Sequence, residues 1–137
     1  MSMRALGKAV ITFQGFDTFD TPPSVLQVTA RTDEVTALCP VTGQPDWYSV
    51  LITYRPRYLC VESKSLKLYL HSFREEGLFC EAFASRIAHD LYSALSPLSI
   101  SVSVVQKARG GISLQSMASL GIPLEEEEEE EEEESSD

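Results

Sequence analysis

Residues 79–105 read FCEAFASRIAHDLYSALSPLSISVSVV, and the spacing of apolar residues changes within this stretch. In its first part, apolar side chains recur every four residues, at Phe79, Phe83, Ile87, Leu91 and Leu95, which is typical of an amphipathic helix. After Pro97, apolar residues alternate with serines from Ser99 to Val105, which is typical of a half-buried strand. The stretch therefore predicts a helix over 79–95 followed by a strand over 99–105.

The sequence on either side predicts the remaining elements. Asp33, Pro40, Gly43 and Pro45 predict a loop over 31–45. The expected elements are, in order, strands over 25–30 and 47–54, a short strand over 58–61, helices over 65–73 and 79–95, a strand over 99–105, and a brief strand over 112–114. Two helices between two pairs of strands favour an α+β fold, with both helices on one face of an antiparallel sheet.

Length and charge indicate one small domain with an acidic tail. We expect a lead-in over 1–24, a folded domain over 25–120 and a disordered tail over 121–137, because residues 125–134 are ten consecutive glutamates. The net charge is -10, but the tail carries eleven negative charges, so the rest of the chain sums to +1. The body therefore lacks the basic stripe that direct nucleic-acid binding needs. Small domains of this size often gain stability by oligomerising.

Three cysteines without paired spacing argue against a disulfide framework. No stretch approaches the roughly 18 apolar residues that span a bilayer, and the first residues lack the apolar run of a signal peptide. We therefore expect a cytoplasmic protein with no membrane association and with free thiols.

Cys39 and Asp46 lie seven residues apart, on one predicted loop that leads into a strand. A thiolate attacks electrophilic carbon, and a nearby carboxyl group can protonate the atom that becomes negative. A lone cysteine is more often a small buried apolar residue, and an aspartate after proline is more often a turn residue. Taken alone, this pair favours the structural interpretation.

Lys64 and Lys67 are three residues apart, so on a helix they share one face. Two ammonium groups on one face suit a phosphorylated ligand. An ordinary solvated basic face has the same spacing, so the residues themselves leave both interpretations open.

Residues 62–69, ESKSLKLY, resemble the signature of the NADPH-dependent 7-cyano-7-deazaguanine reductases, the nitrile reductases of queuosine biosynthesis. Residues 38–47, LCPVTGQPDW, are similar to the nucleophile loop of that family, and residues 72–74 and 109–113 also match. The resemblance covers roughly residues 25–115 and corresponds to the single-module form of the family.

The resemblance implies the tunnelling fold, whose unit is ββααββ and which assembles into homo-oligomeric rings, such as stacked pentamers, with ligands at subunit boundaries. It implies NADPH as cofactor and a small-molecule 7-deazaguanine as substrate. Cys39 would attack the nitrile carbon to form a thioimide, and Asp46 would protonate the nitrogen. Two hydrides would then give the aminomethyl product.

The resemblance also implies the binding residues. Val61, Glu62 and Ser63 would line the substrate site, and Glu81 would accept hydrogen bonds from the N–H edge of the deazaguanine. Lys64 and Lys67 belong to the motif tied to NADPH binding. From its charge, Arg109 is expected to add a phosphate contact.

One position departs from the family pattern. Cys80 stands where the family has a histidine before the glutamate, in the substrate site, and a neutral thiol relays protons poorly near pH 7. Three interpretations follow: a slower reductase that relies on Asp46 alone, a reversible disulfide between Cys80 and Cys39 if their Cα atoms lie within about 7 Å, or an altered activity such as amidine formation.

The rival hypothesis is a catalytically silent tunnelling-fold protein that binds deazaguanine without turnover. No metal is expected, because the cysteines and histidines lack the local pairings of zinc sites.

Overall fold

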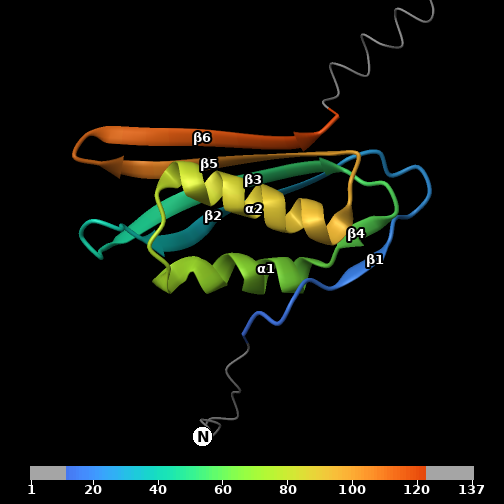
Figure 1. The fold of residues 1–137 in the computed structure, drawn as a ribbon, viewed down its shortest axis with the longest axis horizontal. Coiled ribbons are helices and arrows are strands. Elements are labelled where there is room, and N and C mark those ends of the chain that lie inside the picture. Colours follow the sequence, from blue (N-terminus) through green and yellow to red (C-terminus); the bar gives the residue numbers. More distant parts are fainter. Residues whose placement is uncertain (1–11, 123–137) are drawn as a thin grey trace, which may run out of the picture.

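The computed structural model describes residues 12–122, in which a four-stranded antiparallel sheet carries two helices on one face (Figure 1). The sheet has the strand order β2-β3-β5-β6, and β1 and β4 form a separate two-stranded sheet at one end. The elements are β1 (Thr18–Asp20), β2 (Val28–Leu38), β3 (Pro45–Arg55), β4 (Leu59–Val61), α1 (Ser63–His71), the short 3-10 helix η2 (Ser72–Glu75), α2 (Cys80–Leu95), β5 (Ser99–Arg109) and β6 (Ile112–Gly121). The predicted α+β fold is confirmed.

The core lies between the sheet and the two helices. On β3 every second side chain is buried against the helices, and β5 contributes its own buried alternation; the helices cover these strands with one apolar face each. The largest fully buried side chains are Tyr48, Tyr54, Phe73, Phe83, Ile52, Ile87, Leu91, Leu95 and Ile100. Each such side chain contributes about 1.5–3 kcal/mol by leaving water, so this layer fixes how the strands and helices lie.

The predicted helix over 79–95 and strand over 99–105 are close to α2 and β5. Helix α2 ends at Leu95 because Ser96 has a left-handed conformation, with φ of 45°, and Pro97 follows. The helix predicted over 65–73 begins two residues earlier, at Ser63, because the carboxylate of Glu62 accepts hydrogen bonds from the backbone N–H groups of Lys64 and Ser65.

Two predictions about strands are wrong. The loop expected over 31–45 is largely strand, because β2 continues to Leu38 and absorbs Asp33 and Glu34 in a register shift between Thr32 and Val35. The brief strand expected over 112–114 runs to Gly121, because β6 pairs with β5 along nearly its whole length. The expected lead-in contains the short strand β1.

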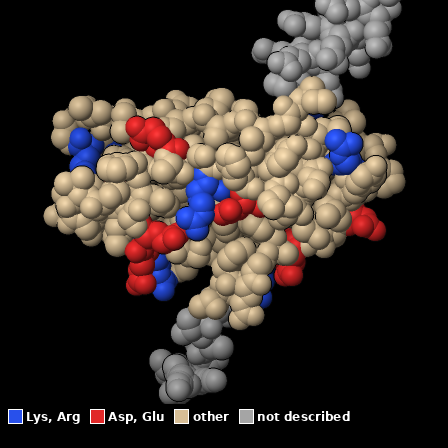
Figure 2. All heavy atoms as spheres, in the orientation of Figure 1, with Lys and Arg blue, Asp and Glu red and all other residues tan. Residues whose placement is uncertain are grey.

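The prediction of a disordered tail over 121–137 falls outside the described residues, apart from Gly121 in β6 and Ile122. Among residues 12–122, no helix is long and apolar enough to cross a membrane. On the face shown in Figure 2, Lys and Arg atoms lie in small separate groups, some of them beside Asp and Glu, so that face carries no continuous basic stripe.

The antiparallel order brings two hairpin turns to the same end of the sheet. The β2–β3 turn and the β5–β6 turn lie side by side because β3 pairs with β5, and α2 begins at this same end (Figure 1). Just before α2, the segment 76–78 is bound to the end of β2: Leu38 N–H donates to the Glu76 carbonyl, and Leu78 N–H donates to the Leu38 carbonyl. We call the end of the sheet that carries the β2–β3 and β5–β6 turns the hairpin end. The β4–α1 junction lies at the opposite end.

Candidate active site

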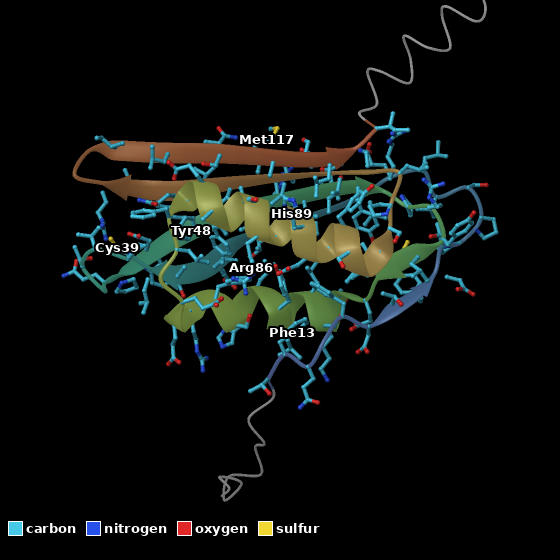
Figure 3. All side chains as sticks on the ribbon, in the orientation of Figure 1. Phe13, Cys39, Tyr48, Arg86, His89 and Met117 are labelled. Carbon is cyan, nitrogen blue, oxygen red and sulfur yellow. The ribbon has the colours of Figure 1, made fainter. Side chains whose placement is uncertain are left out.

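Cys39 follows the end of β2 and Asp46 lies at the start of β3, so the β2–β3 turn connects them. The register pairs Ala37 with Asp46, and Cys39 closes the turn with two backbone hydrogen bonds of 2.8 Å, from its own N–H to Gln44 and to its own carbonyl from Gly43. Gly43 has a φ of 72°, which a residue without Cβ adopts at no steric cost. Cys39 is 8% exposed and Asp46 is 5% exposed. The two residues that the sequence separates by a loop therefore both lie at the hairpin end, where Figure 3 labels Cys39.

Arg109 reaches this pair from the end of β5. Its Nη1 lies 2.8 Å from Oδ1 of Asp46, and its side chain remains 42% exposed. The same guanidinium donates a hydrogen bond to the sulfur of Cys39. Arg109 precedes a tight turn in which Gly110 and Gly111 have φ values of 63° and 84°. The cluster is thus built from two turns that are far apart in the sequence.

Hydrogen bonds to its sulfur lower the pKa of Cys39 from 9.0 to about 6. The largest contribution comes from the side chain and backbone of Thr42, followed by the guanidinium of Arg109 and the backbone of Val41. A thiol with this pKa is mostly thiolate at neutral pH, and the thiolate is the nucleophilic form.

Tyr48 belongs to this cluster, although we did not predict it from the sequence. It lies two residues after Asp46 on β3, so both side chains point to the helix face of the sheet. Burial, with the nearby charges of Asp46, Cys80 and Cys39, raises the pKa of Tyr48. Its hydroxyl donates to Oε1 of Gln106 at 3.2 Å. The strand alternation after Asp46 is the signal that would have identified it.

Cys80 and Glu81 begin helix α2 at the hairpin end. Cys80 is 1% exposed, and its sulfur lies 3.6 Å from the carbonyl oxygen of Val104, to which it donates. Glu81 is exposed in the first turn. All three cysteines are free thiols in the structure. The thiol that replaces the family histidine is therefore directed at strand β5.

Val61, Glu62 and Ser63 lie at the opposite end, at the β4–α1 junction. The same two backbone hydrogen bonds that start α1 lower the pKa of Glu62. The Val61 N–H donates to the hydroxyl of Tyr54 at 3.0 Å. Within one chain, the predicted substrate residues therefore form two groups at opposite ends of the sheet.

Lys64 and Lys67 are exposed on α1. A groove of about 540 Å³ runs between α1 and the β2–β3 side of the sheet, and Lys67 lines it together with Ser63, His71 and Arg31. Of these lining residues, Lys67 and Arg31 bring positive charge, which suits the phosphates of a dinucleotide such as NADPH. Among the described residues, no three His, Cys, Asp or Glu side chains are grouped so that they could hold a metal ion.

Comparisons with known proteins identify the family of this chain. Residues 45–123 match the model of the family described as QueF-like protein. A relative from Frankia casuarinae, named NADPH-dependent 7-cyano-7-deazaguanine reductase, is 43% identical over 106 residues, which cover 77% of this chain and 85% of the relative. A relative of the same name from Streptococcus thermophilus is 49% identical over 90 residues, but this chain spans only 55% of its length.

Among solved structures, an archaeosine synthase described as QueF-Like, in its apo form, has a TM-score of 0.64 at 22% identity. The match covers 75% of this chain and all of that one. At this identity the likeness concerns the fold alone, and it confirms the expected tunnelling fold.

Proposed function

The chain belongs to the QueF-like protein family, and from that premise we propose that it is an NADPH-dependent nitrile reductase. Its substrate would be 7-cyano-7-deazaguanine, and its product the 7-aminomethyl compound that enters queuosine biosynthesis. The observation that carries this proposal is the pair of Cys39, with its lowered pKa, and the buried carboxyl group of Asp46 next to it.

The first step is addition of the Cys39 thiolate to the nitrile carbon. A carbon–sulfur bond forms, one carbon–nitrogen π bond breaks, and its electron pair moves to nitrogen. Asp46 gives that nitrogen a proton, and the adduct is a thioimide. Oδ1 of Asp46 is occupied by Arg109, which has only donors, so Oδ2 is the oxygen that would carry the proton.

NADPH supplies a hydride in each of two reductions, so that one nitrile takes up two hydrides and two protons to become an amine. Between the two reductions, the carbon–sulfur bond to Cys39 breaks and the Cys39 thiolate is regenerated. A sulfur with a pKa of about 6 leaves readily as an anion, so the same hydrogen bonds that prepare the nucleophile also favour its release. Lys64 and Lys67 would hold the cofactor phosphates.

Recognition of the base would use both ends of the molecule. Glu81, exposed at the hairpin end, has a free carboxylate to accept from the N–H groups of a deazaguanine. Glu62 has already accepted two backbone hydrogen bonds, but a carboxylate has about four acceptor positions, so two remain. Within one subunit, these two glutamates lie at opposite ends of the sheet. A complete site that uses both therefore needs a second copy, which a ring of subunits provides.

Cys80 supports a second candidate, a deazaguanine-binding protein without turnover. Its thiol is bonded to the Val104 carbonyl and is a poor proton donor for the site. The lowered pKa of Cys39 argues for turnover, because a protein that only binds the base has no need of a thiolate.

The two candidates differ in one measurement. The protein is mixed with 7-cyano-7-deazaguanine without NADPH, and intact-protein mass spectrometry follows the adduct. The reductase gains the mass of one substrate, loses it after NADPH is added, and consumes two NADPH for each amine formed. Cys39→Ala, which removes the nucleophile, is the control and gains nothing. A wild-type protein that binds the base but forms no adduct and oxidises no NADPH would instead be the silent binding protein.

A further inference from the structure

Arg109 contacts both members of the catalytic pair with a single side chain. Its guanidinium is 2.8 Å from the Asp46 carboxylate and donates to the Cys39 sulfur. It is the last residue of β5, next to the β5–β6 turn, whereas Cys39 lies in the β2–β3 turn and Asp46 at the start of β3. The contact therefore joins the two turns at the point where the proposed chemistry begins.

From this geometry, and resting on the proposed function, we propose that Arg109 is a positioning residue for the reaction. It holds the Cys39 sulfur and the Asp46 carboxyl group in fixed positions before a substrate arrives. From its charge alone, the sequence suggested that Arg109 binds a cofactor phosphate. In the structure its side chain contacts the acid and the nucleophile.

The chemistry of the guanidinium suits this task. It presents five N–H donors in a planar fork and has no acceptor, so it can donate to the Cys39 thiolate and to Oδ1 of Asp46 at once, and it stays charged at every relevant pH. Its exposed position on a turn with two glycines gives it access to the sulfur without burying the charge. A lysine would offer one point charge, which cannot hold the Cys39 sulfur and the Asp46 carboxyl oxygen together in fixed geometry.

Few other groups face the Cys39 sulfur and the Asp46 carboxylate. Tyr48 lies in the same cluster from β3 and Cys80 from α2, and Thr42 and Val41 contribute hydrogen bonds from the turn itself. Of these, Arg109 alone brings a positive charge. Its removal should therefore leave the sulfur beside Asp46 without a compensating cation.

The test measures how the reactivity of Cys39 depends on pH, and it needs neither nitrile nor NADPH. Iodoacetamide labels the folded protein at a series of pH values, and mass spectrometry reads the tryptic peptide 32–57, in which Cys39 is the only cysteine. In the wild type the labelling rate should rise with a midpoint near 6. Arg109→Gln should move that midpoint upward by about one pH unit, and Arg109→Lys should give a smaller shift.

Lys107→Gln is the matched control. It removes one positive charge from the same strand, but Lys107 contacts the Asp33 carbonyl on β2 at 3.4 Å and not Cys39, so its profile should coincide with the wild type. Thermal unfolding verifies that Arg109→Gln is folded, which its exposed position favours. An Arg109→Gln profile that coincides with the wild type would overturn the proposal. A loss of NADPH affinity with an unchanged profile would overturn it as well, and would return Arg109 to the cofactor. Because labelling does not depend on reductase activity, either result leaves the proposed function to its own test.

Discussion

Tyr48 and Gln106 are directly opposite each other in the β3–β5 ladder, and the Tyr48 hydroxyl donates to Oε1 of Gln106 at 3.2 Å. The ring packs edge-on against Phe83, with centroids 5.0 Å apart. Tyr48 is therefore held beneath the Cys39–Asp46 cluster by one aromatic contact and one polar contact, and each contact can be removed separately.

We expect Tyr48→Phe to lower the free energy of unfolding by about 1 kcal/mol, because it removes one hydrogen bond and keeps the ring. Tyr48→Ala should cost about 3–5 kcal/mol, because it also leaves a cavity beside Phe83. Urea unfolding followed by fluorescence measures both. Equal losses in the two variants would show that the ring contact contributes little.

Thr42 contributes more than any other residue to the lowered pKa of Cys39. Its side-chain and backbone hydrogen bonds are the largest causes of the lowered pKa of Cys39. A lowered pKa means that thiolate is present at lower pH: with a pKa of about 6, about nine-tenths of the thiol is ionised at pH 7. Thr42→Val removes the hydroxyl at nearly constant shape, so the titration should move to higher pH.

The ultraviolet absorbance of the thiolate measures this titration directly, with Cys39→Ser subtracted to remove the other two cysteines. Thr29→Val is the matched control, since Thr29 is an exposed threonine near the start of β2, far from the turn that contains Thr42. A titration that stays near pH 6 in Thr42→Val would show that the Thr42 hydroxyl does not set the reactivity of Cys39, and would leave the turn backbone and Arg109 as its causes.

Helix α2 and strand β5 could be predicted from the sequence because each buries side chains at one regular spacing, helical in α2 and alternating in β5. In both elements the buried side chains are the ones that pack in the core. The loop prediction over 31–45 was wrong because it weighed Asp33 as a breaker, whereas a bulge accommodates Asp33 and the alternation resumes at Val35 and Ala37. Strand β6 lies at an edge of the sheet, and most positions of its half-exposed face lack large apolar residues. Its length therefore depends on its pairing with β5, which the apolar pattern does not show.

The candidate site was readable only in part, for a related reason. Cys39 and Asp46 share one hairpin, so their proximity follows from local sequence. The contact between Asp46 and Arg109 depends on the order of strands in the sheet, which no local pattern encodes. The functions assigned to the binding residues remain predictions.

Cys80→His tests whether the missing family histidine limits proton transfer. We expect turnover to rise, because an imidazole titrates near neutral pH and can relay a proton. We also expect unfolding to become easier by about 1–3 kcal/mol, because a larger side chain enters a position that is 1% exposed and tightly packed. Steady-state kinetics and urea unfolding give the two numbers.

Cys80→Asn is the control for size and polarity without a titrating ring, and it should lose stability without gaining turnover. If folded Cys80→His is no faster than the wild type, proton transfer does not limit the reaction. Asp46 would then manage the protons by itself.

The separation of Cys39 from Glu62 leads to a test of the shared site. Within one subunit, these residues lie at opposite ends of the sheet, so a site that uses both must be built from two copies. Cys39→Ala and Glu62→Ala should each be inactive alone. When the two are unfolded together and refolded in equal amounts, about one quarter of the boundaries should combine an intact Cys39 with an intact Glu62, and about one quarter of the activity should return.

A mixture of Cys39→Ala with Asp46→Asn is the matched control, because both residues belong to the hairpin end of the same chain. Every subunit in that mixture carries one defect at this end, so no boundary can be complete and no activity should return. Recovery in the first mixture alone would place each site between two subunits. Recovery in neither mixture would mean that Glu62 serves only to start α1, where its carboxylate accepts hydrogen bonds from Lys64 and Ser65, and loss of that cap would then explain the inactivity of Glu62→Ala.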